Sequence, residues 1–495
     1  MKKKIIQILL STMCVFLLAC GKENDVKSEN SQVLNEDTEV MEKEIEANEY
    51  YEAGRAALYG LDGTEVDCKL AYDNFEKAAE LGKTDANFYL GVLCDWYAYP
   101  EKNYELAKSY YEKCENNPYA NISLGNLYLY GQGVEEDKDK AKEEFQAVIE
   151  QGYIEGYLGN AEIAYDEGDY ETAYANYIKV AEEGAEQLYV AEAMTMLGYM
   201  HFYGKGVEQD YIKALEWYEK AAELHSDYSM NSIALLYYNG HGVEQSYVKA
   251  LEWFEKAAEL YNVEAINNMA YLYLYGLGVE QNYEKALELF ERASEQGDSM
   301  AIYNRGCMYL KGLGVEQDYE KALELFEQAI ELGNVNAMSN MGSMYYEGFG
   351  VEKDYAKALE WFEKAAVSEE KGAVYSIGLL YFEGGFGVEQ DYAKALEWFE
   401  KATKLEHSGA MNQLGWMYYE GLGVEKDYVK ALEWYKKAVD LGNSNAMNNI
   451  GLLYAYGGFG VEQNYEKALE WYEKSADLGN ETAINNAEKI RKKLQ

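Results

Sequence analysis

The residues best suited to catalysis are few in this chain of 495 residues. A histidine can act as a general base, a proton carrier or a metal ligand, and the chain has four. None belongs to a metal-binding motif such as His-Glu-x-x-His, and none has an evident serine or cysteine nucleophile beside it. We therefore predict packed or solvent-exposed histidines, no metal site, no cofactor and no enzyme activity. The four are His201, His225, His241 and His407.

A glycine-rich segment, Gly-x-Gly-Val-Glu, recurs nine times and is the next pattern that could do chemistry. Glycine-rich loops bind phosphate when they follow a strand and open a helix. Here the segment lies between two predicted helices, lacks the Gly-x-Gly-x-x-Gly spacing and ends in glutamate. We predict a structural turn instead, in which glycine supplies backbone freedom. The valines of the segments are Val134, Val207, Val243, Val279, Val315, Val351, Val388, Val424 and Val461.

Four cysteines lie beyond the N-terminal segment, at positions that do not follow the spacing of the glycine segments. Cys94 and Cys114 fall in the two predicted helices of one early repeat. An exported protein can form disulfides, so a Cys94–Cys114 bridge and free thiols both stay open. The other two are Cys68 and Cys307.

Acidic residues outnumber basic ones by 88 to 44, which gives a formal net charge of −44. This charge excludes nucleic-acid binding, because Lys and Arg must displace the counterions of phosphate. No carboxylate pair stands out as an acid–base dyad, and no Asp-x-Asp-x-Asp-Gly loop for calcium is present. The two prolines and the many strong helix formers predict an all-α protein.

The N-terminus carries an export pattern. Three lysines precede an apolar run over residues 5–18, which is shorter than the roughly 20 residues that a membrane-spanning helix needs. The run ends in Leu17-Leu18-Ala19-Cys20-Gly21, which resembles the lipobox of bacterial lipoproteins. The resemblance implies cleavage before Cys20 and lipid attachment at Cys20. The protein would then be extracytoplasmic, held on a bacterial membrane by this anchor alone. The alternative is an ordinary signal peptide.

Three regions follow from this reading. Residues 1–19 are the predicted signal peptide. Residues 20–48 are polar and lack a hydrophobic period, so we expect the acylated cysteine followed by a flexible tether. Residues 49–495 carry the folded part.

The folded part is one unit repeated at intervals of 36 or 37 residues, with one interval of 73 that contains a degenerate repeat. Each unit predicts two helices. The second helix opens at an acid or amide that can cap its backbone N–H groups, as at Asp210, Asn282 or Asp427. It commonly ends at Leu-Gly, as at Leu332-Gly333.

The signature of the unit resembles that of the Sel1-like repeat, a variant of the tetratricopeptide repeat. Gly415, Tyr418, Ala431, Tyr435 and Ala438 match the glycine, tyrosine, alanine, aromatic and alanine positions. The resemblance implies a right-handed superhelical α/α solenoid of about twelve helix pairs over residues 49–495. Residues 481–494 would form a capping helix. Some secreted relatives staple each repeat with a cysteine pair and are linked to β-lactam binding, a pattern that this chain lacks.

Six tryptophans occupy one position of the repeat, and leucine fills the two gaps between them. We predict that this column packs between neighbouring repeats, because large aromatic side chains bury much apolar area there; a ladder of ligand-binding rings is the alternative. The column is Trp217, Trp253, Leu289, Leu325, Trp361, Trp398, Trp434 and Trp471.

By resemblance, the first helices line a concave face, and its groove positions lie three before, one after and four after the signature glycine. These positions hold amides, hydroxyls and rings, which suit an extended peptide; partly buried packing residues are the alternative. They hold no Lys or Arg, so a clamp for acidic peptide tails is absent. The candidate binding residues are Asn267, Tyr271, Tyr303, Tyr346, Tyr375, Trp416 and Tyr419, and the first column also holds Asn231, Asn412 and Asn448.

The favoured function is a lipid-anchored extracytoplasmic scaffold or adaptor that binds a protein or peptide. The net charge favours a neutral or basic partner. An enzyme or enzyme regulator acting on cell-wall material or β-lactams is the second hypothesis. A surface protein that buffers divalent cations ranks last.

Overall fold

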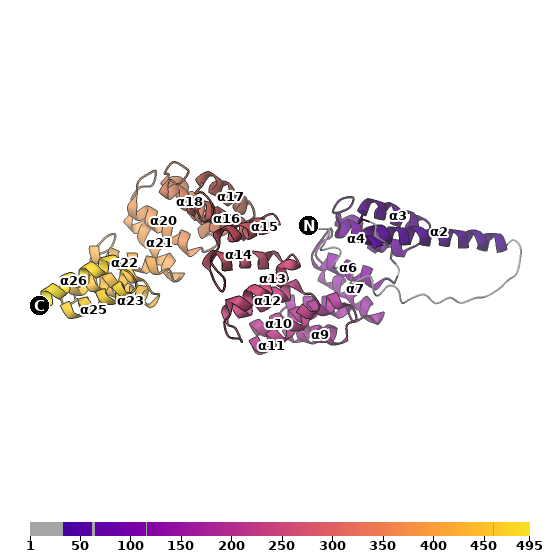
Figure 1. The fold of residues 1–495 in the computed structure, drawn as a ribbon, viewed down its shortest axis with the longest axis horizontal. Helices are drawn as coiled ribbons and strands as arrows, with labels where there is room; N and C mark the ends of the chain where they lie inside the picture. Colours follow the sequence, from indigo (N-terminus) through magenta and orange to yellow (C-terminus); the bar gives the residue numbers. More distant parts are fainter. Residues whose placement is uncertain (1–32, 62–64, 115, 459) are drawn as a thin grey trace. The chain divides into compact units, whose positions relative to one another are not determined.

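The computed structural model describes residues 33–61, 65–114, 116–458 and 460–495 (Figure 1). Within these ranges the chain forms 25 α-helices and no strand, apart from two isolated β-bridges. The all-α helical repeat solenoid predicted from the sequence is therefore confirmed.

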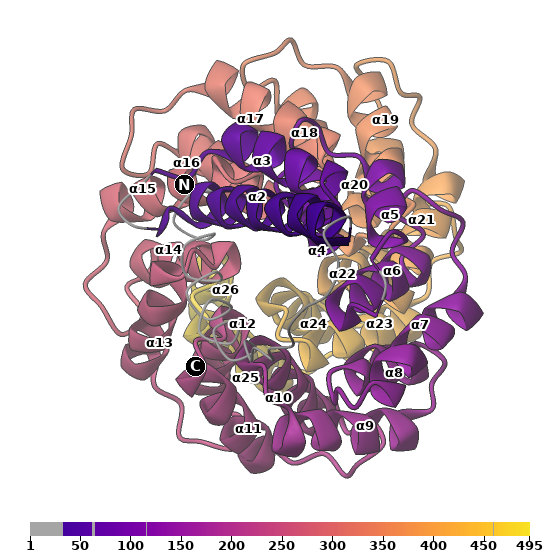
Figure 2. The ribbon, with the colours of Figure 1, turned by 90° about the vertical axis from the view of Figure 1, so that its right-hand side faces the viewer.

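The chain divides into two compact units. The first contains the residues up to Leu272 together with Gly276–Glu280, and the second contains Tyr273–Tyr275 together with Gln281–Gln495. Each repeat contributes a first and a second helix, and Figure 2 shows α9, α11 and α13 of the first unit outside α10 and α12. The described helices make twelve such pairs and a last single helix.

The first helices are α2 (Val33–Tyr59), α4 (Asp85–Asp95), α6 (Pro118–Leu129), α8 (Gly156–Asp166), α10 (Gln187–Tyr203), α12 (Asp227–Asn239), α14 (Val263–Tyr275), α16 (Ser299–Lys311), α18 (Val335–Glu347), α20 (Lys371–Glu383), α22 (Ser408–Glu420) and α24 (Ser444–Tyr456).

The second helices are α3 (Cys68–Glu80), α5 (Tyr104–Tyr111), α7 (Lys138–Glu150), α9 (Tyr170–Glu183), α11 (Tyr211–Glu223), α13 (Tyr247–Glu259), α15 (Tyr283–Ser294), α17 (Tyr319–Glu331), α19 (Tyr355–Ala366), α21 (Tyr392–Lys404), α23 (Tyr428–Asp440) and α25 (Tyr465–Asp477). The capping helix predicted at the C-terminus is α26 (Glu481–Leu494).

The predicted caps open the second helices. The Asp427 carboxylate accepts hydrogen bonds from the backbone N–H groups of Val429 and Lys430, both at 3.0 Å. Asp210 and Asn282 cap α11 and α15 in the same way. Because a short polar side chain at this position satisfies N–H groups that have no helical partner, the sequence alone fixes where these helices begin.

The glycine segment ends the first helix and contacts the preceding repeat. Gly312 follows α16 with φ +65° and ψ +41°, the left-handed conformation that stops a helix. Gly314 has φ +70°, and a β-carbon there would lie 2.7 Å from the Cβ of Tyr283, the first residue of α15. The segment is thus a structural turn, as predicted. It also packs each repeat against the preceding one.

In the core, a small residue of the first helix packs against an aromatic ring of the second helix. A β-carbon on Gly415 of α22 would lie 2.5 Å from the Tyr435 ring of α23, so glycine here brings the two helices of a pair close together. Most of the core clusters of the second unit join the second helix of one repeat to the first helix of the next. Neighbouring repeats therefore share one continuous apolar interior.

The tryptophan column packs between repeats, as predicted. Trp361, Trp434 and Trp471 are half-buried and each packs against a cluster that includes the preceding repeat. A lysine three residues later covers each ring; Lys364 lies 3.9 Å from the Trp361 ring and Lys437 lies 4.0 Å from the Trp434 ring. The lysine supplies a cation–π contact and shields the outer face of the ring.

The predicted tether is wrong over its second half, because α2 begins at Val33. The segment 33–48 is rich in Glu, and it runs without a break into the first helix of the first repeat. Ala47 is 3% exposed, so the helix already packs against the fold there. Glutamate and alanine favour a helix even where no hydrophobic period is visible. The predicted signal peptide and Cys20 lie outside the described residues.

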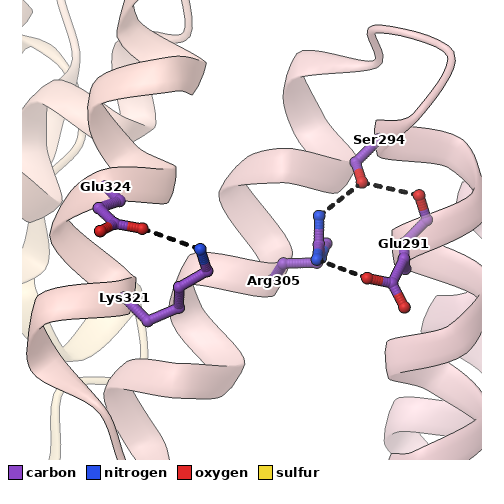
Figure 3. A network of polar contacts seen from close by, with 5 residues as sticks. All are labelled: Glu291, Ser294, Arg305, Lys321 and Glu324. Atoms are coloured by element: carbon purple, nitrogen blue, oxygen red, sulfur yellow. Dashed lines mark hydrogen bonds and ion pairs between the residues drawn. The ribbon is translucent and has the colours of Figure 1, made fainter.

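Polar contacts also join neighbouring repeats. In Figure 3, Arg305 of α16 reaches back to α15, where it donates to the Ser294 hydroxyl at 2.9 Å and to the Glu291 carboxylate at 2.8 Å. The Arg305 side chain is only 16% exposed. Its two hydrogen bonds, one to each residue, therefore stabilise the contact between the two helices more than a surface ion pair would. The pair Lys321–Glu324 in the same view lies within α17.

Candidate functional site

Three of the four histidines have clear structural roles. His201 is 4% exposed, its Nε2 lies 3.2 Å from the Tyr174 hydroxyl, and burial lowers its pKa. His407 caps α22, its Nδ1 accepting from the Ala410 N–H at 3.1 Å, and burial lowers its pKa as well. The His241 ring stacks on Tyr211 of the preceding repeat at 4.8 Å. This last contact was not predicted, although Phe349 at the same loop position also stacks on a tyrosine, and Phe386 packs on Tyr355 at a tilt.

The cysteines are free thiols in the described part of the chain, so no bridge joins Cys94 and Cys114. Cys94 is buried, and this burial is the main cause that raises its pKa to about 11. Burial raises the pKa of Cys114 to about 12. A nucleophilic thiol needs the opposite shift. Among the residues that the structure describes, no group of three His, Cys, Asp or Glu side chains is placed to hold a metal ion.

An aromatic run begins at two predicted groove positions of α22, Trp416 and Tyr419, and ends at Tyr428, the first residue of α23. Trp416 stacks on Tyr419 with ring centroids 5.5 Å apart, and Tyr419 stacks on Tyr428 at 4.8 Å. All three rings are half-buried. Burial and the neighbouring Tyr428 hydroxyl raise the pKa of Tyr419 to about 12, so the hydroxyl stays protonated. The run offers rigid rings and hydroxyl groups on one surface.

A second aromatic pair repeats this arrangement on α18. Tyr346 stacks on Tyr355 at 4.9 Å, and its hydroxyl donates to the Glu383 carboxylate at 2.6 Å. The Lys353 ammonium lies 5.5 Å from the Tyr346 ring. Because the ring and hydroxyl already have partners within the protein, Tyr346 is a preorganised surface residue.

Tyr375 and Tyr303 are more deeply engaged in packing. Tyr375 stacks on His407 at 4.3 Å and lies 5.6 Å from the Phe399 ring, and burial raises its pKa. Tyr303 lies 5.9 Å from Phe326. Both rings are half-buried, so they present an edge to solvent while they also stabilise the repeat.

The asparagines of the first groove column, Asn231, Asn267, Asn412 and Asn448, partly serve to join neighbouring repeats. Asn267 is 9% exposed and Asn231 is 4% exposed, which leaves little of either amide on the surface. The Asn231 side chain accepts from Asn268 of the next first helix at 3.3 Å, and Asn412 accepts from Asn449 at 2.9 Å. Tyr271 is half-buried beside this column. Amides expected to bind a peptide backbone thus hydrogen-bond mainly across repeats.

A polar cluster on α8 and α10 was missed. Glu162 follows Ala161, which holds the place of the signature glycine in the degenerate repeat, but the predicted columns began only at Asn231. The Tyr130 hydroxyl donates to the Glu162 carboxylate at 2.8 Å. Burial, and next the nearby Glu192 charge, raise the pKa of Glu162 to about 7. Aligning the degenerate repeat with the others would have found this groove position.

These features define the class: a helical repeat solenoid whose first helices carry half-buried rings and amides. The chain belongs to the Sel1 repeat family. Eleven repeats match, over residues 50–83, 84–113, 118–152, 191–226, 227–262, 263–298, 299–334, 335–366, 372–407, 408–443 and 444–480. The pair α8–α9 lies outside these matches, as the degenerate repeat predicts.

Solved structures and sequences of similar proteins agree with this assignment. A protective antigen of uropathogenic Escherichia coli with an SLR fold is 30% identical, with a TM-score of 0.57 over 94% of this chain and 91% of that chain. An uncharacterised protein of Neisseria meningitidis serogroup B is 30% identical over 192 residues, 31% of this chain and 41% of that relative. The chain therefore aligns with less than half of the Neisseria protein.

Proteins of this family generally act as protein-interaction scaffolds, and the fold is typically non-enzymatic. In the described part of the chain, no helix combines the length and apolar character needed to cross a bilayer.

Proposed function

We propose that the protein is a lipid-anchored extracytoplasmic scaffold that binds a protein or peptide along its first helices. The aromatic run Trp416–Tyr419–Tyr428 carries the binding part of the proposal, because rigid half-buried rings supply contact area with little loss of side-chain entropy. Tyr346 and Tyr375 extend the surface on the same unit. The net charge of −44 favours a partner that is neutral or basic.

The anchor part of the proposal rests on the sequence around Cys20. The similar E. coli protein is described as a protective antigen, which agrees with export. We expect cells fed an alkyne fatty acid to label the wild-type chain and not the Cys20→Ser variant. Labelling of neither chain would contradict the anchor and would leave an ordinary signal peptide as the explanation of the N-terminus.

Removing the rings is expected to release the partner. Crosslinking in intact cells, followed by mass spectrometry, would identify the proteins held by the wild-type chain. In the variant Tyr375→Ala/Trp416→Ala/Tyr419→Ala we expect about a tenfold lower recovery of the main crosslinked protein, since buried aromatic contacts dominate such interfaces. The control is Trp96→Ala, which removes a ring that is 74% exposed in the other unit.

Circular dichroism would establish that the triple variant keeps its helices. Because Tyr375 also packs on Phe399, the milder variant Trp416→Ala/Tyr419→Phe provides a second test with less disturbance of the core. Unchanged recovery in both folded variants would show that the partner binds elsewhere.

A further inference from the structure

The polar cluster in the first unit is defined by Tyr130, Glu162, Tyr177 and Glu192. Tyr130 follows the end of α6, Glu162 lies on α8, Tyr177 on α9 and Glu192 on α10. Figure 2 shows α6, α8 and α10 on the inner side of α7 and α9. The two carboxylates therefore come from neighbouring first helices, on the face where a partner is proposed to bind.

The carboxylates of the cluster lack a positive partner. Neither Glu162 nor Glu192 forms an ion pair with any Lys, Arg or His that the structure describes, although many other acids of the chain do. The nearby Asp166 is already paired with Lys138 at 3.7 Å. Glu162 is half-buried and Glu192 is exposed. The two carboxylates repel each other, and a cation between them would remove that cost.

An unsatisfied hydroxyl lies beneath the carboxylates. Tyr177 is 0% exposed, and its hydroxyl oxygen has no hydrogen-bond partner among the residues that the structure describes. Burial, and next the charges of Glu162 and Glu192, raise the pKa of Tyr177, so its hydroxyl lies near the two carboxylates. Buried hydroxyl groups are nearly always hydrogen-bonded, and one without a partner implies a missing donor or acceptor.

Two aromatic rings lie on the same helices as the carboxylates. Tyr165 of α8 and Tyr199 of α10 lie 6.2 Å apart, edge to face, and Tyr199 is 38% exposed. Tyrosine rings attract cations that carry flat or apolar groups. A hard metal ion is a poor match for this site, because calcium and magnesium require more converging oxygen ligands than two carboxylates supply.

We propose that the cluster is a subsite for a cationic side chain, lysine or arginine, of the bound protein segment. This inference rests on the proposed scaffold function and adds the chemical class of one recognised residue. The two carboxylates accept hydrogen bonds from the ammonium or guanidinium, and the oxygen of the Tyr177 hydroxyl accepts one more. The tyrosine rings pack along its aliphatic stem.

A short peptide can test the subsite without knowledge of the natural partner. The probe is Gly-Arg-Gly-Arg-Gly with an uncharged dye, and its binding to the full chain is followed by fluorescence anisotropy at about 150 mM salt, where long-range attraction is screened. We expect the variant Glu162→Gln/Glu192→Gln to bind at least about tenfold more weakly than wild type, the loss typical of hydrogen bonds to charged groups.

The matched control is Glu255→Gln/Glu259→Gln, which makes the same change of charge at two exposed positions of α13. We expect the control to bind the probe within about twofold of wild type, and a citrulline version of the probe to bind no variant well. Equal weakening in both double variants would mean that net charge alone attracts the peptide, and it would overturn the subsite. Equal binding of the citrulline probe would overturn it too.

Release of a proton from Glu162 on binding would distinguish a specific site from attraction by the net charge of the chain. Because the pKa of Glu162 is about 7, a cation that binds there should release a fraction of a proton at pH 7. Calorimetry in two buffers of different ionisation enthalpy measures this release, which should vanish in Glu162→Gln. The other titratable groups that act on the cluster are Glu192, Asp166, Tyr130, Tyr165 and Tyr177.

The subsite and the scaffold can fail separately. If the crosslinked partner binds Glu162→Gln/Glu192→Gln as well as wild type, the subsite is wrong and the scaffold stands. If no partner is captured but the arginine probe still distinguishes the two double variants, the scaffold proposal fails and the cation site stands.

Discussion

Replacing Gly314 by alanine is expected to lower the free energy of unfolding of the second unit by about 3 kcal/mol. Gly314 has φ +70°, where a side chain costs roughly 1 kcal/mol of backbone strain. The new β-carbon would also lie 2.7 Å from the Cβ and 2.8 Å from the carbonyl carbon of Tyr283. Backbone atoms cannot rotate away, so the loop must lift from the preceding repeat, at a cost of about 1–3 kcal/mol more.

Gly297→Ala separates these two contributions. Gly297 has φ +85°, but nothing lies within 4 Å of the position of its β-carbon. We expect this control to lose only about 1 kcal/mol, the strain alone. Urea unfolding followed by circular dichroism would give the two losses, and hydrogen exchange in α15 and α16 would locate them. Equal losses would show that the loop does not support the preceding repeat.

Lowering the pH from 8 to 5 is expected to stabilise the wild-type chain by about 2 kcal/mol more than it stabilises Glu162→Gln. The pKa of Glu162 is about 7 in the folded chain, against an ordinary value of 4.5. The folded state therefore binds this proton more tightly than the unfolded state. The resulting stabilisation builds up as the pH falls from about 7 towards 4.5 and is absent above pH 7.

Hydrogen exchange in α8 and α9 measures this difference, with wild type and variant compared at each pH so that intrinsic exchange rates cancel. The control Glu255→Gln removes an exposed carboxylate of α13 and should follow the wild-type profile. This comparison matters because a chain with a charge of −44 gains stability on protonation at many sites. Identical profiles for wild type and Glu162→Gln would mean that Glu162 is well hydrated in the folded chain.

The fold was predictable because its determinants are local. A cap such as Asp427, a stop such as Gly312 and the small residue Gly415 each act within one repeat, so a single repeat of sequence contains them. Because the repeat recurs along the chain, each of these cap, stop and packing signals appears many times in the sequence. The helical extension of α2 escaped prediction, because its residues favour a helix by composition rather than by an apolar stripe.

The candidate binding residues were harder to predict, because their roles depend on neighbours about 36 residues away. Asn231 is placed at a groove position by the repeat, yet its amide joins Asn268 of the next first helix. His241 was predicted to be either packed or solvent-exposed, and its stacking on Tyr211 of the preceding repeat was not foreseen. Glu162 lies in the one repeat that departs from the pattern. Such contacts are set by the stacking of repeats, which the sequence of one repeat does not contain.

The packing of the glycine loops against the preceding repeat also affects how a chain of this kind can gain or lose repeats. Most junctions use the same kinds of partner, a loop glycine on a tyrosine and a tryptophan or leucine on the shared core. Gly387 and Gly460 differ, because they meet Ala356 and Val429 of the preceding repeat. A duplicated or deleted block of 36 residues therefore joins its neighbours through contacts that already exist. The repeats with one extra glycine absorb it in a small β-bridge within the loop, as between Gly385 and Val388. Recombination can thus change the number of repeats, and with it the length of the solenoid, without a new kind of interface between repeats.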